Sequence, residues 1–509
     1  MLDNPRKLLI VLALVIAFCV LAPLANLIFE GINGLSNGSI SLGEDGLKQI
    51  EGSLLLVIFT ALLGGTIGTA NGWLLANCRF PGRKFLRIAQ LLPLATPAYL
   101  LTATLIDLGS IYSIRIYGMI WAVVIMSVTT YPYVFLLSTE SFSISGQSQL
   151  EASRSLGVGP WKSFRRIALP MALPAIGAGI ALMGMEVINE LGAVQLLNVP
   201  SISAGIVENW VVQGNPSGAI GLALIALIIV MTLVAYERAL RRRSRRWNDG
   251  VAGGQAPSWV LQGFRAYLAQ ILAISPPLFT LGIPIFWVLT NFRQISKGLD
   301  SELFMLTIRT LTLGLLTAFI SVSVALILSI ATRWNNSFII RSFSFLSGIG
   351  YAIPGVVLAI ALLYFTGNPW NFAPILLLLW GYSDRFLAVA KGGLDAAFER
   401  ISPNLDEAAT GLGCKWPDVL KRVHLPLLKG PIAIGGLLVF VDTLKELPLT
   451  FVLRPFDFDT LSVRVFQYAG DERMAESILP ALIILFLGLI ASLALIPGLE
   501  YSEKKNSSS

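Results

Sequence analysis

The chain has little of what catalytic and metal sites are usually built from. Its 509 residues include only three cysteines and one histidine. Cys19, Cys78 and Cys414 lie too far apart for a CxxC or zinc-binding spacing, and His424 has no second histidine to complete a metal cage. We therefore expect no metal site here, with the cysteines acting as small apolar fillers and His424 as a polar loop residue.

Charge is scarce as well. Charged residues make up 13% of the chain and hydrophobic residues 55%, with a mean hydropathy of +0.73. Soluble globular chains carry about 25% charged residues, so this composition excludes a water-facing globule and requires lipid. The net charge of +7 comes from short basic clusters between apolar runs, a pattern typical of membrane topology and not of nucleic-acid binding.

No nucleotide-binding loop is present. The sequence contains no GxxxxGK[ST] motif, and the stretch from Gly157 to Ser163 lacks the necessary Gly-Lys pair. One histidine, no paired cysteines and no nucleophile motif also leave little chemistry for a membrane enzyme. We predict that the chain is not an enzyme and that it holds no cofactor.

Twelve apolar segments are long enough to cross a bilayer, which takes about 20 residues. They are 8–29, 52–76, 86–108, 117–139, 171–197, 218–237, 266–290, 303–332, 339–366, 372–390, 430–453 and 476–498. The apolar run of the first exceeds that of a typical signal peptide, which favours a retained anchor. The sequence therefore predicts an all-α membrane protein with about twelve transmembrane helices.

Basic residues predict the orientation of these helices. Clusters precede the first segment, follow the second, fourth, sixth and tenth, and end the chain. All of them fall on one side if every segment crosses, and the opposite loops hold fewer basic residues. The positive-inside rule then places both termini in the cytoplasm.

An internal repeat divides the chain. Glu151-Ala152-Ser153, Gly157 and Ile167-Ala168-Leu169-Pro170 recur 256 residues later as Glu407-Ala408-Ala409, Gly413 and Val423-His424-Leu425-Pro426. Such a repeat indicates duplication, and two halves of six helices packed together give pseudo-twofold symmetry. The stretch from Arg241 to Trp259 is basic, then rich in Gly and Pro, as linkers are. We predict a first half at 1–245, a linker at 246–262, a second half at 263–500 and a disordered tail at 501–509.

Each copy of the repeated motif lies in a long cytoplasmic loop. A short helix should run from Glu151 to Leu156 and stop at Gly157 in a left-handed cap. Pro160, or Pro417 in the second copy, is well placed to start the next turn. A compact amphipathic element of this kind can dock into a groove of a partner. A helix lying in the lipid interface is the alternative, but two copies at identical spacing favour docking.

The pattern EAA, three residues, G, nine residues, I-x-L-P resembles the EAA loop of ABC importer permeases of the MetI-like, type I class. The first copy departs by Ser153 for Ala and the second by Val423 for Ile. The resemblance covers nearly the whole chain and implies a type I permease fold in the inner membrane. It also implies two ATP-binding subunits, which carry ATP and Mg²⁺, and an external binding protein. The residues implied in contact with those subunits are Glu151, Ala152, Gly157, Pro170, Glu407, Ala408, Gly413 and Pro426.

The substrate is less clear from the sequence. The strings Lys445-Glu446-Leu447-Pro448, Leu453-Arg454-Pro455-Phe456, Arg385-Phe386-Leu387 and Glu399-Arg400-Ile401 resemble fused permeases for ferric iron, which implies iron import with an iron-binding protein outside the cell. Fused thiamine permeases have the same layout and are the alternative. A more remote alternative is an ATP-independent secondary transporter, because such carriers can also have parallel repeats.

Ionisable residues inside the predicted spans are candidates for a substrate pathway. Glu186 and Glu190 in one half align with Asp442 and Glu446 in the other, and Lys445 lies beside them. Residues four apart share one helical face, and each charge costs roughly 2.5–3.5 kcal/mol to insert. Oxygen ligands suit ferric iron, so these carboxylates could guide cargo. They could equally be structural, with Lys445 neutralising Glu446 or Asp442.

Overall fold

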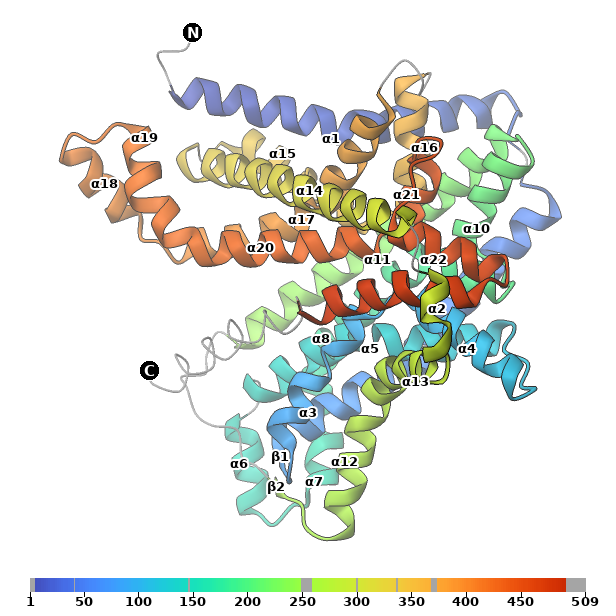
Figure 1. Cartoon of the computed structure of the whole chain (residues 1–509). Coiled ribbons are helices and arrows are strands. Elements are labelled where there is room, and N and C mark those ends of the chain that lie inside the picture. The colour runs from blue at the N-terminus through green and yellow to red at the C-terminus, as the bar shows by residue number, and fades with distance from the viewer. Residues whose placement is uncertain are drawn as a thin grey trace. The chain divides into compact units, whose positions relative to one another are not determined.

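The computed structural model describes residues 5–40, 42–144, 147–248, 259–298, 301–335, 337–367 and 373–490. Nearly all of these residues are helical (Figure 1). In the described part of the chain, strand occurs only as two short segments, β1 (Cys78–Arg79) and β2 (Trp259–Val260). The predicted all-α fold is confirmed.

Two runs of helices follow one another along the chain. The first comprises α1 (Pro5–Ser36), α2 (Gly43–Asn77), α3 (Arg83–Ala89), a 3₁₀ helix (Leu92–Ala95), α4 (Ala98–Ile111), α5 (Met119–Ile144), α6 (Gln147–Ser155), α7 (Pro160–Ser163), a π-helical turn (Phe164–Ala168), α8 (Leu169–Asn189), α9 (Gly192–Leu196), α10 (Ile202–Val207), a π-helical turn (Glu208–Val212) and α11 (Pro216–Asn248). The second comprises α12 (Phe264–Pro277), a π-helical turn (Leu278–Gly282), α13 (Ile283–Thr290), a 3₁₀ helix (Phe292–Gly298), α14 (Ser301–Trp334), α15 (Phe338–Leu346), a 3₁₀ helix (Gly350–Ala352), α16 (Gly355–Thr366), α17 (Pro374–Glu399), α18 (Pro403–Gly411), α19 (Trp416–Val419), a π-helical turn (Leu420–His424), α20 (Leu425–Lys445), α21 (Pro448–Leu453), α22 (Leu461–Gly470) and the helix Met474–Ile490.

Eight helical stretches in the described residues are long and apolar enough to cross a membrane, and ten if each of two bent pairs counts as one span. The two other predicted spans are the tenth and the twelfth. The tenth corresponds to α17, whose apolar run is interrupted by Asp384, Arg385 and Lys391. The twelfth corresponds to the helix Met474–Ile490, and its predicted continuation to residue 498 lies outside the described residues.

The chain forms two compact units, which are described separately. Unit 1 contains Met1–Ser41, Asn209–Leu224 and Asp300–Val463, and unit 2 contains Leu42–Glu208, Ile225–Leu299 and Arg464–Ser509. The units therefore differ from continuous sequence halves. In unit 1, α1 packs on α14, α15 and α16, and Trp380 Nε1 donates a hydrogen bond to the Cys19 carbonyl at 3.1 Å. In unit 2, α12 and α13 pack on α3 and α4.

The core of unit 2 is formed by α2, α5 and α8. Small residues in α2 allow α5 to approach closely. A Cβ atom on Gly68 would lie 2.8 Å from the Tyr131 carbonyl oxygen, and one on Gly72 would lie 2.2 Å from Ser138 Oγ. Gly68 and Gly72 therefore lie directly against α5, because backbones without intervening side chains can approach each other.

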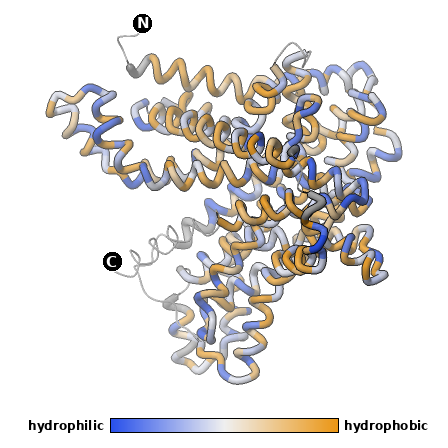
Figure 2. The backbone as a smooth tube through the Cα atoms, viewed as in Figure 1, coloured by the Kyte–Doolittle hydropathy of each residue, from blue (hydrophilic) through white to orange (hydrophobic). Residues whose placement is uncertain are grey.

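In unit 1 the corresponding helices α14, α17 and α20 pack together. Figure 2 shows hydrophobic residues along most of α1, whereas the segment of α18 and α19 is largely hydrophilic. A helix that is apolar along its length suits lipid and protein neighbours, while a polar segment belongs in water. The hydropathy pattern therefore sets α18 and α19 apart from the spanning helices.

The predicted linker is partly structured. Trp259 and Val260 of β2 pair in parallel with Cys78 and Arg79 of β1, and the Leu261 amide donates to the Arg79 carbonyl at 2.9 Å. The end of the linker is thus attached to the segment that follows α2. Residues 249–258 of the linker and the predicted tail at 501–509 lie outside the described residues.

Candidate functional site

The two repeated loops have the same backbone plan. Each consists of a nine-residue helix, a four-residue helix and a five-residue π-helical turn that leads into a long helix, and every boundary recurs 256 residues later. Gly157 and Gly413 have φ angles of +73° and +85°. This is the left-handed conformation that the sequence predicts for both glycines, because a residue with a Cβ atom is strained there. Pro160 and Pro417 lie in the first turn of the second helix, also as predicted.

The resemblance implies that the two repeated loops are coupling loops, which contact the ATP-binding subunits, and all of the residues implied in that contact are exposed. These are Glu151, Ala152, Gly157, Pro170, Glu407, Ala408, Gly413 and Pro426. Large apolar side chains accompany them: Leu156 is 81% exposed, Leu412 is 85% exposed and Trp161 is 69% exposed. Exposed apolar side chains grouped on a hydrophilic loop are typical of a surface that binds another protein.

The first loop is held to its bundle by an apolar and neutral polar contact. Leu150 in α6 is fully buried, as is Ser163 in α7. The hydroxyls of Ser153 and Ser163 lie 2.9 Å apart and form a hydrogen bond. The departure of Ser153 from the Ala of the EAA pattern thus has a structural partner in the following helix.

Aromatic rings extend this anchor. Trp73 of α2 lies 5.1 Å from the Phe164 ring, 5.5 Å from Phe142 and 5.4 Å from Trp259, measured between ring centroids. Trp161 stacks on Phe164 at 5.5 Å. Because Trp259 belongs to β2, the linker strand, α2 and the first loop share one aromatic cluster.

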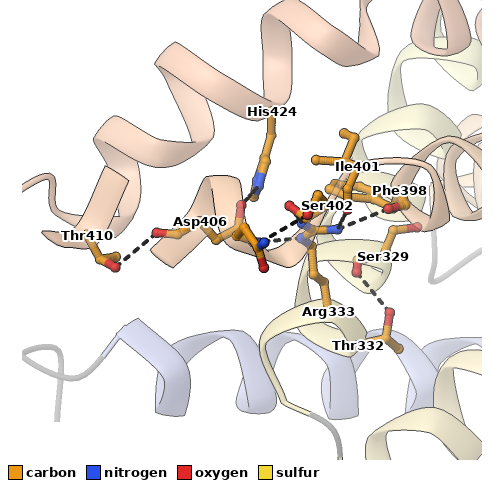
Figure 3. A network of polar contacts seen from close by, with 10 residues as sticks. Ser329, Thr332, Arg333, Phe398, Ile401, Ser402, Asp406, Thr410 and His424 are labelled. Atoms are coloured by element: carbon orange, nitrogen blue, oxygen red, sulfur yellow. Dashed lines mark hydrogen bonds and ion pairs between the residues drawn. The ribbon is translucent and has the colours of Figure 1, made fainter. Parts of the chain in front are cut away.

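The second loop is held by charge (Figure 3). Arg333, at the end of α14, donates from Nε to Asp406 Oδ2 of α18 at 2.7 Å. Asp406 Oδ1 lies 2.7 Å from Nε2 of His424, the last residue of the π-helical turn. His424 is fully buried, while the side chains of Arg333 and Asp406 are 13% and 19% exposed. A cation, a carboxylate and an imidazole thus connect three elements of unit 1.

The surroundings of this network set its protonation. Burial would raise the pKa of Asp406, but the hydrogen bonds from Arg333 and His424 and their charges outweigh burial and lower the pKa. Asp406 is therefore a carboxylate at neutral pH, and the His424 Nε2 facing it carries a hydrogen. The imidazole ring packs against Trp334 and Phe398, with centroid separations of 5.9 and 5.4 Å.

Aligned positions explain why the two anchors differ. At an offset of 256 residues, Asn77 corresponds to Arg333, Leu150 to Asp406 and Ala168 to His424. Among the described residues, Asn77 donates one long hydrogen bond, 3.5 Å to the Phe142 carbonyl. Sequence reasoning missed Arg333 and Asp406, and it treated His424 as an isolated polar residue. The available signal was the acid Asp406 at the position aligned with Leu150, immediately before the Glu that both copies share.

The carboxylates of the predicted substrate pathway lie in different environments from those expected. The prediction that each pair lies on one helical face is wrong, because α8 ends at Asn189 and α20 ends at Lys445. Glu190 and Glu446 follow these ends with extended backbone. Glu190 Oε1 accepts a hydrogen bond from Ala193 N at 2.8 Å, and Glu446 Oε1 accepts one from Leu449 N at 3.1 Å. Each acid thus binds the start of the short helix that follows it. The breaks also divide the predicted spans 171–197 and 430–453.

Positive charges lie beside the two acids of the second half. Lys445 Nζ is 2.9 Å from Asp442 Oδ1. Arg385 Nε of α17 is 3.3 Å from Glu446 Oε2, with both side chains buried, and Arg385 Nη1 donates to the Ile353 carbonyl at 2.9 Å. Glu186 is partly buried in α8. Of the two alternatives for Lys445, the structure has the pair with Asp442, while Glu446 pairs with a residue that sequence reasoning had not considered.

A second acid is buried next to this ion pair. Asp384 precedes Arg385 in α17, and neither of its carboxyl oxygens has a hydrogen-bond partner among the described residues. In that same part of the chain, no group of three or more His, Cys, Asp or Glu side chains is placed to hold a metal ion. Arg385 and Glu446 thus form a buried ion pair, and the buried Asp384 carboxyl group is next to Arg385 in the same helix.

Comparison with known proteins gives the same assignment as the loops. The chain is 26% identical over 461 residues to the Fe(3+)-transport system permease protein FbpB 2 of Haemophilus influenzae, covering 87% of this chain and 88% of the relative. It is 31% identical over 153 residues to the sulfate transport system permease protein CysT of Escherichia coli, covering 28% of this chain and 55% of the relative. It is 28% identical over 224 residues to the molybdenum transport system permease protein ModB of Escherichia coli, covering 39% and 93%.

A family model matches twice. Residues 68–246 and 321–496 both match the model of the binding-protein-dependent transport system inner membrane component. The two matches contain both coupling loops, and together they cover more than half of the chain. The duplication inferred from the repeated motif is therefore a duplication of this module. The chain belongs to the family of binding-protein-dependent transport system inner membrane components and is a fused, two-half permease of an ABC importer.

Proposed function

We propose that this permease moves ferric iron, delivered by an extracytoplasmic iron-binding protein, across the bacterial inner membrane into the cytoplasm. The observation that carries the proposal is the similarity over 87% of the chain to a permease named for Fe(3+) transport. The sulfate and molybdenum permeases are similar to less than half of this chain. The fused layout of two modules therefore supports the iron branch of the family.

Energy would come from two ATP-binding subunits, one at each coupling loop. Two observations support this arrangement: the loops have identical backbone plans, and the Glu and the first Ala of each motif are exposed together with Leu156 and Leu412. The sequence contains no phosphate-binding loop of its own. In this proposal ATP and Mg²⁺ stay on the partner subunits, and both chain termini lie in the cytoplasm with the loops.

Uptake of labelled ferric iron by a strain lacking this chain tests the substrate. We expect uptake to fall to background and to return when the chain is supplied from a plasmid. Thiamine uptake serves as the parallel measurement. Unchanged iron uptake together with lost thiamine uptake would move the assignment to thiamine, and transport that persists in ATP-depleted vesicles would favour a secondary transporter.

The carboxylates remain candidates for guiding cargo. Pairing with Lys445 and Arg385 supports a structural role for Asp442 and Glu446. A guiding role for Glu186 and Glu190 stays a prediction. Glu186→Gln tests it: iron uptake should fall while the amount of chain in the membrane is unchanged, and unaltered uptake would argue against the guiding role.

A further inference from the structure

One guanidinium group occupies the junction between the second coupling loop and its helix bundle. Arg333 donates from Nε to Asp406, from Nη1 to the Phe398 and Ile401 carbonyls at 3.0 and 3.1 Å, and from Nη2 to the Ser402 carbonyl at 3.3 Å. All three nitrogens are therefore used. Figure 3 shows the side chain reaching from the end of α14 to these acceptors.

The acceptors lie on both sides of the hinge that leads into the loop. Phe398 belongs to the last turn of α17, and its carbonyl accepts from the Ile401 amide at 3.1 Å as well as from Arg333. Ile401 and Ser402 connect α17 to α18, and Asp406 lies in the first turns of α18. A planar guanidinium satisfies several carbonyls in fixed geometry and also complements the negative end of the helix dipole. Arg333 thus fixes the angle between α17 and α18.

The same network reaches the helix that leaves the loop. His424 contacts Asp406 and is the residue immediately before α20. A rotation of α18 would therefore be passed to α20 through Asp406 and His424 and to α14 through Arg333. The residues of the first half that align with Arg333, Asp406 and His424 are Asn77, Leu150 and Ala168. None of these three side chains is charged, so they cannot form the same connection.

We infer that Arg333, acting through Asp406, is the positioning residue that makes the second coupling loop move as one body with α14 and α20 and so transmits the ATPase stroke into that half of the permease. The inference rests on the proposed coupling function of the loops. It makes the two loops mechanically unequal, because the first is attached by packing and the second by charge-assisted hydrogen bonds.

The test uses the full permease co-expressed with its ATPase subunits and reconstituted in lipid vesicles with its binding protein. Asp406→Asn keeps the size of the side chain but removes the charge. We expect ferric iron taken up per ATP hydrolysed to fall about tenfold, the effect of losing one charge-assisted hydrogen bond. Arg333→Lys keeps the positive charge but loses the planar guanidinium with its several donors. It should give an intermediate amount of iron taken up per ATP hydrolysed. Glu399→Gln removes an exposed carboxylate nearby on α17 and should leave the ratio unchanged.

A second measurement separates local positioning from general destabilisation. In a chain lacking its three native cysteines, a spin label at Leu412→Cys reports the second loop and one at Leu156→Cys reports the first. Asp406→Asn should raise the mobility of the label at position 412 and leave that at position 156 unchanged. The inference would be overturned if the label at position 412 had the same mobility with and without Asp406→Asn. It would also be overturned if Asp406→Asn took up the normal amount of iron per ATP hydrolysed.

The outcomes also distinguish this inference from the proposed function. If the unmodified permease fails to co-purify with the ATPase subunits, the coupling function itself is wrong. If the unmodified complex transports iron and Asp406→Asn does so with the same ratio, only the positioning role of Arg333 is wrong. Co-purification of Asp406→Asn with the ATPase is expected, because the exposed docking residues are unchanged.

Discussion

The two coupling loops have the same backbone conformation but differ in the side-chain contacts that anchor them. Both turn at a glycine with positive φ and end in a π-helical turn. In the first loop the polar contact is Ser153 with Ser163, and the aligned residues of the second loop are Ala409 and Val419. In the second loop the polar contact is Asp406 with His424, and the aligned residues of the first are apolar. Duplication thus retained the geometry while the polar pair occupies a different position in each loop.

The difference shows which features the coupling element requires. Left-handed glycines and helix boundaries recur in both copies, so the path of the backbone is constrained. The anchor is free to be apolar or ionic as long as its buried charges are paired, because an unpaired buried charge costs several kcal/mol. Sequence identity between the copies therefore marks the docking surface better than it marks the anchor.

The largest effect is expected from placing the acid of the second loop into the first without its partners. Leu150 is fully buried, so Leu150→Asp would bury a carboxylate while the positions aligned with Arg333 and His424 hold only Asn77 and Ala168. We expect destabilisation of about 3–5 kcal/mol, seen as a lower melting temperature of the purified permease and less chain in the membrane. The triple change Leu150→Asp, Asn77→Arg and Ala168→His should recover part of the loss. Failure of the triple variant to exceed the single one would show that the anchors are not interchangeable.

The next largest effect is expected at the loop glycines. Gly157→Val and Gly413→Val force a β-branched residue into the left-handed region at a cost of about 1–3 kcal/mol each. A Cβ atom at either site meets no atom within 4 Å, so the strain comes from the backbone alone. Iron uptake by the double variant should fall about tenfold or more, with normal amounts in the membrane fraction. Uptake at the wild-type level would count against a docking role. A difference in uptake between the two single variants would show which loop contributes more to transport.

Acid should affect the second anchor and spare the first. Because the pKa of Asp406 is lowered in the folded protein, its contribution to stability is present above its ordinary pKa of about 4 and is lost as pH falls through the folded value. Melting temperatures of the wild type and Asp406→Asn should therefore differ at pH 7 and converge as pH falls below about 4. A constant difference between the two proteins down to pH 3 would contradict the assigned protonation.

The smallest effect is expected where the first loop departs from the EAA pattern. Ser153→Ala removes the hydrogen bond to Ser163 and creates the residue type found at Ala409. The free energy of unfolding should fall by about 1 kcal/mol, the net value of one neutral hydrogen bond, with little change in uptake. Thermal unfolding in detergent provides the measurement, and Ser155→Ala, at an exposed position of the same helix, is the matched control. A loss of uptake comparable to that of the glycine variants would mean that Ser153 contributes to docking.

Local patterns predicted much of the fold. Apolar runs located the helices, and the repeated motif located both loops with the left-handed glycines and the helix-starting prolines. These features depend on residues close in sequence, so one chain suffices to predict them. The break after Asn189 was missed because the apolar pattern continues through it, whereas Pro448 gives a local helix-breaking signal in the second half only.

By itself, the sequence determined that this chain is helical, spans a membrane, is duplicated and carries the same loop motif in both halves. Only the tertiary structure decided which side chains pair: Arg333 with Asp406, Arg385 with Glu446 and Trp73 with Trp259. It also decided that α1 packs with α14–α16. The physical reason is that periodicity and turn chemistry are local, whereas burial brings together groups separated by tens to hundreds of residues, and only burial makes their pairing obligatory.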